Sequence, residues 1–153
     1  MRPPDRRGFT LIEVLIVVII MAVLAGVLIS QFSNTADDAK ESTLKHNQHA
    51  LQSHIALYRM DHSEQYPTIQ NDGLPQLTQA TDRAGKAGPP GPDYPFGPYL
   101  VGELPRNSFD NSNKVTAVAA PGQKPTAAVG ALGGWQYDAS NGTLWPNHPA
   151  YYK

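Results

Sequence analysis

The sequence of 153 residues contains no cysteine. This absence excludes a disulfide framework, a thiolate nucleophile and a cysteine-ligated zinc site. An excess of positive charge is also missing, because 12 Lys and Arg residues stand against 13 Asp and Glu residues, so no nucleic-acid partner is expected. The chain further lacks a nucleophile elbow, a phosphate-binding loop and a dinucleotide fingerprint. We therefore expect no enzymatic activity.

Proline is absent from the segment between Phe9 and Tyr66, although the whole chain has 14 prolines and 13 glycines. Proline is the residue that most strongly interrupts a helix. Its absence predicts one continuous helix from Phe9 to about Asp61, which Tyr66-Pro67 would end. Most of the glycines and prolines follow this point, so residues 63–153 are expected to be rich in loops.

The longest apolar segment, residues 9–29, has the length of a membrane span. As a helix it would extend about 32 Å, against roughly 30 Å for the hydrocarbon core of a bilayer. Residues 1–8 carry three arginines, and the positive-inside rule keeps such a segment in the cytoplasm. The sequence therefore predicts a single-pass protein whose C-terminal part lies on the far side of the membrane.

One acidic residue, Glu13, lies inside this apolar segment. An acidic side chain at the centre of a bilayer costs about 2.5–3.5 kcal/mol on insertion scales. An ionisable group at such a position is a functional candidate, and its partner has to be identified.

The residues around Glu13 form a long motif, Gly8-Phe9-Thr10-Leu11-Ile12-Glu13-Val14-Leu15-Ile16-Val17-Val18. This motif resembles the prepilin signature shared by type IV pilins and the pseudopilins of type II secretion. The resemblance implies that a prepilin peptidase removes residues 1–8 by cutting between Gly8 and Phe9. It also implies that the same enzyme methylates the new N-terminus at Phe9.

Cleavage after Gly8 would expose a positive amine at the N-terminus of a helix, where the helix dipole adds positive character. The carboxylate of Glu13 can pair with such an amine. We expect the pair to form between Glu13 of one subunit and Phe9 of a neighbour, so that both residues serve filament assembly. A role for Glu13 within its own chain is the alternative.

Residues 30–62 are polar but keep a helical period, which predicts an amphipathic continuation of the membrane-length helix. The expected apolar stripe consists of Phe32, Ala36, Ala39, Thr43, Leu51, Ile55 and Tyr58, with a gap near Asn47. Residues 51–61 and 66–68 are similar to the end of the long helix in the major pseudopilins of type II secretion. Residues 97–100 and 104–107 are similar to the segment that enters the first strands of that family.

Residues 63–153 are expected to form a loop region and a small sheet. A short helix is predicted at 73–81, with Leu74 and Leu77 facing inward, and an irregular loop at 85–98. Weak strand patterns occur at 115–119 and 127–132. Asn141-Gly142 lies between two alternating segments and predicts a hairpin, with Trp135 and Tyr137 on one face. The expected fold class is α+β and pilin-like, a long N-terminal α-helix packed on a small antiparallel β-sheet.

Calcium is the main open question about a cofactor. The resemblance to the major pseudopilins implies a calcium ion in a loop between C-terminal strands, but the acidic segment of that loop is missing here. Calcium takes six to eight oxygen ligands. Asp110, Asn111, Asn113 and Asp138 could supply some of them. The alternative is that Asn111 and Asn113 form a polar turn and that Asp138 precedes the hairpin turn.

Together these features favour a structural subunit of a type II secretion pseudopilus. The resemblance implies a bacterial inner-membrane protein with a periplasmic C-terminal domain, which then joins a periplasmic filament. The implied partners are further copies of the chain, the prepilin peptidase, minor pseudopilins, the inner-membrane assembly platform and the membrane. One alternative is a type IV pilin or minor pilin for adhesion, motility or DNA uptake. The other is an uncut membrane-anchored binding or enzyme domain.

Overall fold

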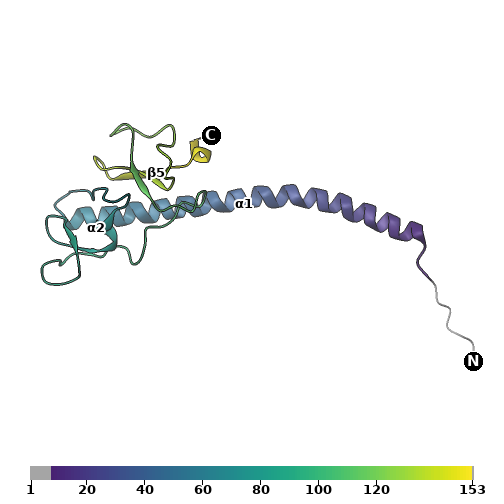
Figure 1. The fold of residues 1–153 in the computed structure, drawn as a ribbon, viewed down its shortest axis with the longest axis horizontal. Helices are drawn as coiled ribbons and strands as arrows, with labels where there is room; N and C mark the ends of the chain where they lie inside the picture. The colour runs from purple at the N-terminus through teal and green to yellow at the C-terminus, as the bar shows by residue number, and fades with distance from the viewer. Residues whose placement is uncertain (1–7, 153) are drawn as a thin grey trace, which may run out of the picture. The chain divides into compact units, whose positions relative to one another are not determined.

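The computed structural model describes residues 8–152, without the side chains of residues 28–34. Two compact units divide between Ala39 and Lys40. The elements follow one another in the order α1 (Leu11–Asp61), α2 (Pro75–Thr78), β1 (Ala80–Thr81), β2 (Ala87–Gly88), β3 (Val115–Ala117), β4 (Trp135–Asp138), β5 (Thr143–Pro146) and the 3-10 helix η1 (Pro149–Tyr152). Figure 1 shows the long helix, the loops around α2 and the sheet that contains β5.

Helix α1 is continuous from Leu11 to Asp61, which confirms the prediction drawn from the missing prolines. The helix stops because Ser63 and Glu64 adopt positive φ angles of 52° and 66°, which no helical residue can have. The amide of Glu64 donates to the carbonyl of Arg59 at 3.1 Å, and the two side chains form an ion pair. The end of the helix is therefore closed before Tyr66-Pro67 is reached.

The second half of α1 packs through one stripe of buried side chains, as the period predicted. Leu44, Leu51, Ile55 and Tyr58 are all at most 3 % exposed. The expected members Ala36, Ala39 and Thr43 are exposed, Leu44 is buried in place of Thr43, and the side chain of Phe32 lies outside the described ones. The prediction was wrong at Thr43 because the apolar side chain of Leu44, one residue later, packs into the core.

Polar side chains account for the gap in the stripe near Asn47. Asn47 Nδ2 donates to the carbonyl of Arg106 at 2.9 Å, and Gln48 Nε2 donates to the carbonyl of Leu144 at 2.7 Å. These two bonds tie the helix to segments far away in the sequence, so the helix and the sheet remain joined where apolar contacts are missing.

His62 ends the packed stripe and was not identified from the sequence. The ring is 2 % exposed and stacks on Tyr58 with the ring centroids 3.9 Å apart. Its Nδ1 lies 2.9 Å from the carbonyl of Tyr58, and its Nε2 lies 3.0 Å from the carbonyl of Asp82 and 3.1 Å from Thr81 Oγ1. This imidazole therefore connects the end of α1 to the loop that follows β1.

The main sheet has the order β3-β4-β5, and the hairpin of β4 and β5 is confirmed. The predicted antiparallel sheet was wrong in one pairing, because β3 and β4 are parallel, with Val115 opposite Trp135. Residues 127–132, expected to form a strand, do not form one. The connection between β3 and β4 is therefore a loop that returns the chain to the end of the sheet where β3 starts, and β4 starts at that same end.

One face of this sheet forms the core together with α1. Trp135 and Tyr137 are buried on the same face, as the strand period predicted, and they pack with Val115 and Leu144 against the helical stripe. The polar atoms of the two aromatic residues are satisfied, since Trp135 Nε1 donates to the carbonyl of Pro105 and Tyr137 Oη donates to that of Pro67.

The segment before the main sheet differs from the prediction in both its helix and its loop. The expected helix at 73–81 is only the single turn of α2, although Leu74 and Leu77 are buried as expected. Strand β1 follows directly and pairs with β2 inside the expected irregular loop at 85–98. The helix is short because Gln79 has an extended backbone, which directs the chain into β1.

Candidate functional site

The bond between Gly8 and Phe9 is the first predicted site. Residues 1–7 of the predicted leader lie outside the described residues. Gly8 and Phe9 are both exposed, Phe9 to 88 %, and both precede the first helical residue, Leu11. Exposed backbone outside regular structure is the kind that a peptidase can take into its active site. The geometry suits the predicted cut, while the cut and the methylation of Phe9 stay predictions.

Glu13 forms a capping box with Thr10 at the start of α1. The amide and the hydroxyl of Thr10 both donate to Glu13 Oε2 at 2.8 Å. The amide of Glu13 donates in return to Thr10 Oγ1 at 3.3 Å. This reciprocal arrangement satisfies two amides that a helix start would otherwise leave without partners.

The capping box is a role for Glu13 within its own chain. The Thr-x-x-Glu spacing of Thr10 and Glu13 is the sequence signal for this capping box. The interpretation of the motif from sequence did not use this spacing. A carboxylate at this place also lies at the positive end of the helix dipole. The pairing of Glu13 with Phe9 of a neighbouring subunit stays a prediction.

The first part of α1 exposes apolar side chains on every side. From Leu11 to Val27 the large hydrophobic residues of the helix keep between 48 % and 85 % of their area exposed, and Phe9 before it keeps 88 %. An apolar patch of this size is typical of a surface that other molecules cover.

Within the described residues, no helical stretch combines the length and the apolar character required of a membrane span.

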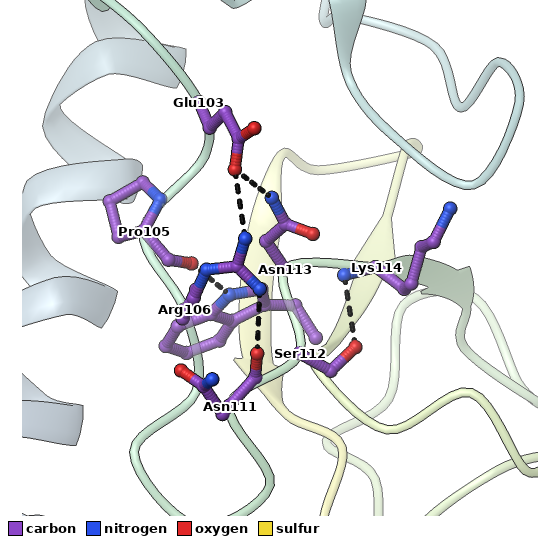
Figure 2. Close-up of polar contacts among 8 residues, drawn as sticks. Glu103, Pro105, Arg106, Asn111, Ser112, Asn113 and Lys114 are labelled. Carbon is purple, nitrogen blue, oxygen red and sulfur yellow. Dashed lines mark hydrogen bonds and ion pairs between the residues drawn. The ribbon is translucent and has the colours of Figure 1, made fainter.

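Three of the calcium candidates lie in one turn, which Figure 2 shows in part. Asp110 accepts from the amide of Ser112 at 2.8 Å and from the amide of Gly134 at 2.9 Å. The carbonyl of Asn111 accepts from the Arg106 guanidinium at 2.9 Å. This is the polar turn that the sequence offered as the alternative to a metal site.

The carboxylate of Glu103 organises the exposed side of the same turn. It accepts from Arg106 at 3.0 Å and from the side-chain amide of Asn113 at 3.2 Å (Figure 2). The amide group of Asn113 thus donates a hydrogen bond there. The Arg106 guanidinium therefore neutralises the charge of Glu103, and the side-chain amide of Asn113 donates a further hydrogen bond to it.

The fourth candidate, Asp138, lies at the other end of β4. Gly134, the partner of Asp110, precedes the first residue of β4, whereas Asp138 is its last. At about 3.3 Å per residue, the two are separated by roughly 13 Å along the strand. The structure therefore does not bring the four candidates together. In the part of the chain that it describes, no three His, Asp or Glu side chains are grouped to hold a metal ion.

Two family models match the chain. A model of the prokaryotic N-terminal methylation motif matches residues 4–29. A model of the type II secretion system (T2SS) protein G matches residues 31–143, which is more than half of the chain. The first match covers the motif around Glu13, and the second covers the packed part of α1 and the sheet up to the start of β5.

Curated relatives carry the name type II secretion system core protein G. The relative from Klebsiella michiganensis is 29% identical over 146 residues, covering 94% of this chain and 98% of the relative. The one from Vibrio cholerae is 28% identical over 138 residues, covering 90% and 87%. The one from Pseudomonas aeruginosa is 33% identical over 79 residues, covering 52% and 54%. No solved structure matches the chain significantly.

These matches confirm the prediction of a type II secretion pseudopilin over a type IV pilin or an anchored enzyme domain. They agree with the order of the motifs along the chain, from the apolar N-terminal segment to the C-terminal hairpin. The chain belongs to the type II secretion system protein G family and is a major pseudopilin, a structural subunit and not an enzyme.

Proposed function

We propose that this pseudopilin waits in the bacterial inner membrane, anchored by residues 9–29, with residues 30–153 in the periplasm. It then joins a periplasmic filament that supports protein export. The observation that carries the proposal is the ring of apolar side chains from Phe9 to Val27, each at least 48 % exposed in the single chain. Lipid covers this surface before assembly, and the same segment of other copies covers it afterwards.

Processing prepares the subunit for this exchange. A prepilin peptidase cuts the exposed bond between Gly8 and Phe9, which removes residues 1–8, and methylates Phe9. The new amine lies two residues before the first helical residue, Leu11. Its positive charge adds to that of the helix dipole, so the mature N-terminus attracts a carboxylate.

Glu13 is the carboxylate that pairs with this positive charge. In the stored subunit it caps its own helix through Thr10. In the filament it also meets the Phe9 amine of a neighbour. Loss of one member of such a buried pair costs about 3–5 kcal/mol, which is enough to decide whether a subunit leaves the lipid.

The partners follow from this sequence of events. The chain contacts the membrane and the prepilin peptidase first, then an inner-membrane assembly platform of the secretion system. In the filament it contacts copies of itself and minor pseudopilins.

Two substitutions of Glu13 separate its capping role from its charge. Glu13→Gln keeps a side chain that suits a capping box but has no charge, whereas Glu13→Ala removes both functions. We expect both variants to insert into the membrane and to lose most filament assembly, measured by shearing and immunoblotting after overexpression of the secretion system.

Thr10→Ala is the matched control, because it removes the two bonds of the Thr10 hydroxyl from the capping box and keeps the charge of Glu13. Its cost is about 0.5–2 kcal/mol of helix stability, so assembly should fall much less. A filament yield of Glu13→Gln equal to wild type would contradict the pairing with Phe9. A Thr10→Ala defect as large as that of Glu13→Ala would show that capping is the role of Glu13.

A further inference from the structure

The loop of residues 118–134, which joins the parallel strands β3 and β4, contains no strand or helix. Such a long irregular connection needs fixed points if it is to keep one conformation. The structure holds it with polar side chains from the sheet and its margins. Gln136 Nε2 donates to the carbonyl of Ala127 at 2.8 Å, and Asp138 Oδ2 accepts from the amide of Gly122 at 2.5 Å.

Asn147 holds the same loop from the end of β5. Its Oδ1 accepts from the amide of Val129 at 2.7 Å, and its Nδ2 donates to the carbonyl of Val129 at 2.8 Å. The side chain is 2 % exposed and pairs with one residue as a neighbouring strand would. A second bond from Nδ2 reaches the carbonyl of Gly133 at 3.1 Å.

Of these three side chains that hold the loop, Gln136, Asn147 and Asp138, the last is the carboxylate. Both oxygens of Asp138 accept hydrogen bonds. Oδ1 accepts from the amide of Ser140 at 2.9 Å and from its hydroxyl at 2.6 Å, while Oδ2 accepts from Gly122. Burial raises the pKa of Asp138, but these hydrogen bonds more than offset it and hold the pKa below its usual value. Three donated hydrogen bonds thus use most of the roughly four lone-pair sites of this carboxylate.

The positive charge of the loop also disfavours the binding of a cation. Residues 111–137 contain Lys114 and Lys124 and no Asp or Glu. Calcium requires six to eight oxygen ligands, usually with several carboxylates among them. Asp110 cannot join Asp138, because Asp110 is bonded to Gly134 just before β4, whereas Asp138 is the last residue of β4 and is bonded to Gly122. The residues present therefore do not fit the calcium ion that the resemblance to the major pseudopilins implies.

We propose that hydrogen bonds from Asp138, Gln136 and Asn147 hold the β3–β4 loop in place of a metal, so that this pseudopilin folds independently of calcium. Asp138 is a structural anchor of the loop and not a calcium ligand. The proposal concerns the C-terminal unit alone and is independent of the pairing between Glu13 and Phe9.

The first test compares the purified full chain in detergent with millimolar CaCl2 and with EGTA. The thermal midpoint should be the same in both buffers, and calorimetric titration should give no saturable calcium binding. A ligand at 100 times its dissociation constant raises the midpoint by several degrees. A rise of that size, or saturable binding at the loop, would overturn the proposal.

The second test uses Asp138→Ala, with Asp93→Ala at an exposed loop position as the matched control. We expect Asp138→Ala to lower the midpoint equally in both buffers, and Asp93→Ala to leave it unchanged. In hydrogen exchange, the amide of Gly122 should exchange roughly tenfold faster in Asp138→Ala, while that of Val129, bonded to Asn147, should change less.

The milder variant Asp138→Asn keeps an oxygen acceptor for one of the donors, so it serves if Asp138→Ala does not fold. Its midpoint should lie below that of wild type by the same amount with CaCl2 and with EGTA. If wild type is more stable in CaCl2 than in EGTA, and either Asp138 variant abolishes this difference, Asp138 is a calcium ligand and the proposal is wrong.

Discussion

The two ends of α1 differ in what their side chains contact, although they belong to one unbroken helix. From Leu11 to Val27 the large apolar residues are exposed on all sides. From Leu44 to Tyr58 one stripe of the helix is buried at 3 % exposure or less, and the remaining positions are polar or partly exposed. The first part leaves its large apolar side chains exposed, whereas the second part buries its stripe in the core of the C-terminal unit.

This difference shows that one secondary structure can serve two purposes along its length. The second part of α1 contributes to the stability of the C-terminal unit by burying area against Trp135, Tyr137 and Leu144. Under the proposed function, the first part buries area only when lipid or other subunits cover it. Substitutions in the two parts should therefore affect different measurements.

The largest effect is expected from Leu51→Ala in the packed part. Leu51 is fully buried, so the substitution leaves a cavity and should reduce the free energy of unfolding by about 2–5 kcal/mol. Leu57→Ala is the control on the same helix, because Leu57 is 49 % exposed and should cost much less. Denaturant unfolding followed by circular dichroism measures both; equal losses would contradict the packing described here.

Val18→Asp should have the opposite pattern. Val18 is 56 % exposed in the single chain, so the thermal midpoint of the C-terminal unit should not change. If residues 9–29 span the membrane as proposed, an acidic residue near their centre costs roughly 2.5–3.5 kcal/mol, so membrane fractionation and filament yield should fall. Val18→Leu is the control and should behave as wild type. Normal fractionation of Val18→Asp would count against the membrane role of residues 9–29.

Gly142→Ala tests the contact of the hairpin turn with the end of α1. Gly142 has a φ angle of +71°, and an added Cβ would collide with the ring of Tyr66 and approach Ile55. We expect a loss of about 1–3 kcal/mol in the free energy of unfolding, from overpacking and backbone strain. Gly102→Ala has a similar strain at φ +95° but open space around it, so its loss should be smaller.

The smallest effect is expected from alkaline pH acting on Tyr137. Burial raises the pKa of this phenol, which donates to the carbonyl of Pro67. A raised pKa means that the folded state keeps a proton that the unfolded state loses near pH 10. The contribution of Tyr137 to stability should therefore be constant below about pH 10 and decline above it, by up to about 1.4 kcal/mol per pH unit for each such group.

Tyr137→Phe should lessen this decline, although its stability at neutral pH is lower because the carbonyl of Pro67 loses its donor. Tyr152, whose pKa burial raises to about 12, is expected to retain part of the decline. An unchanged slope in Tyr137→Phe would show that Tyr137 does not contribute to it.

The features set by local sequence were predictable. The missing prolines predicted α1, and the alternation around Asn141-Gly142 predicted the hairpin of β4 and β5. The capping box of Thr10 and Glu13 was also visible as a spacing, but the motif was interpreted first through the neighbouring subunit, and the role within its own chain was an alternative without a named partner. Each of these features depends on residues close together in the chain, where period and turn chemistry decide.

The parallel pairing of β3 and β4 was not predictable in the same way. Residues 127–132 have a strand-like composition, yet Val129 pairs with the side chain of Asn147 instead of with another strand. That contact joins residues far apart in sequence. No local sequence pattern predicts that the side chain of Asn147 forms the hydrogen bonds that a neighbouring strand would form. Residues 127–132 therefore form no strand between β3 and β4, and the antiparallel sheet that the local pattern suggested was wrong in this pairing.

The central claim is that the apolar segment of α1 becomes a filament core after processing at Gly8. Mass spectrometry of the protein purified from cells that contain the secretion system tests it most directly. The account predicts a chain that begins at Phe9 and carries one methyl group on its N-terminal nitrogen. A chain that still contains residues 1–8 while secretion is fully active would contradict the account.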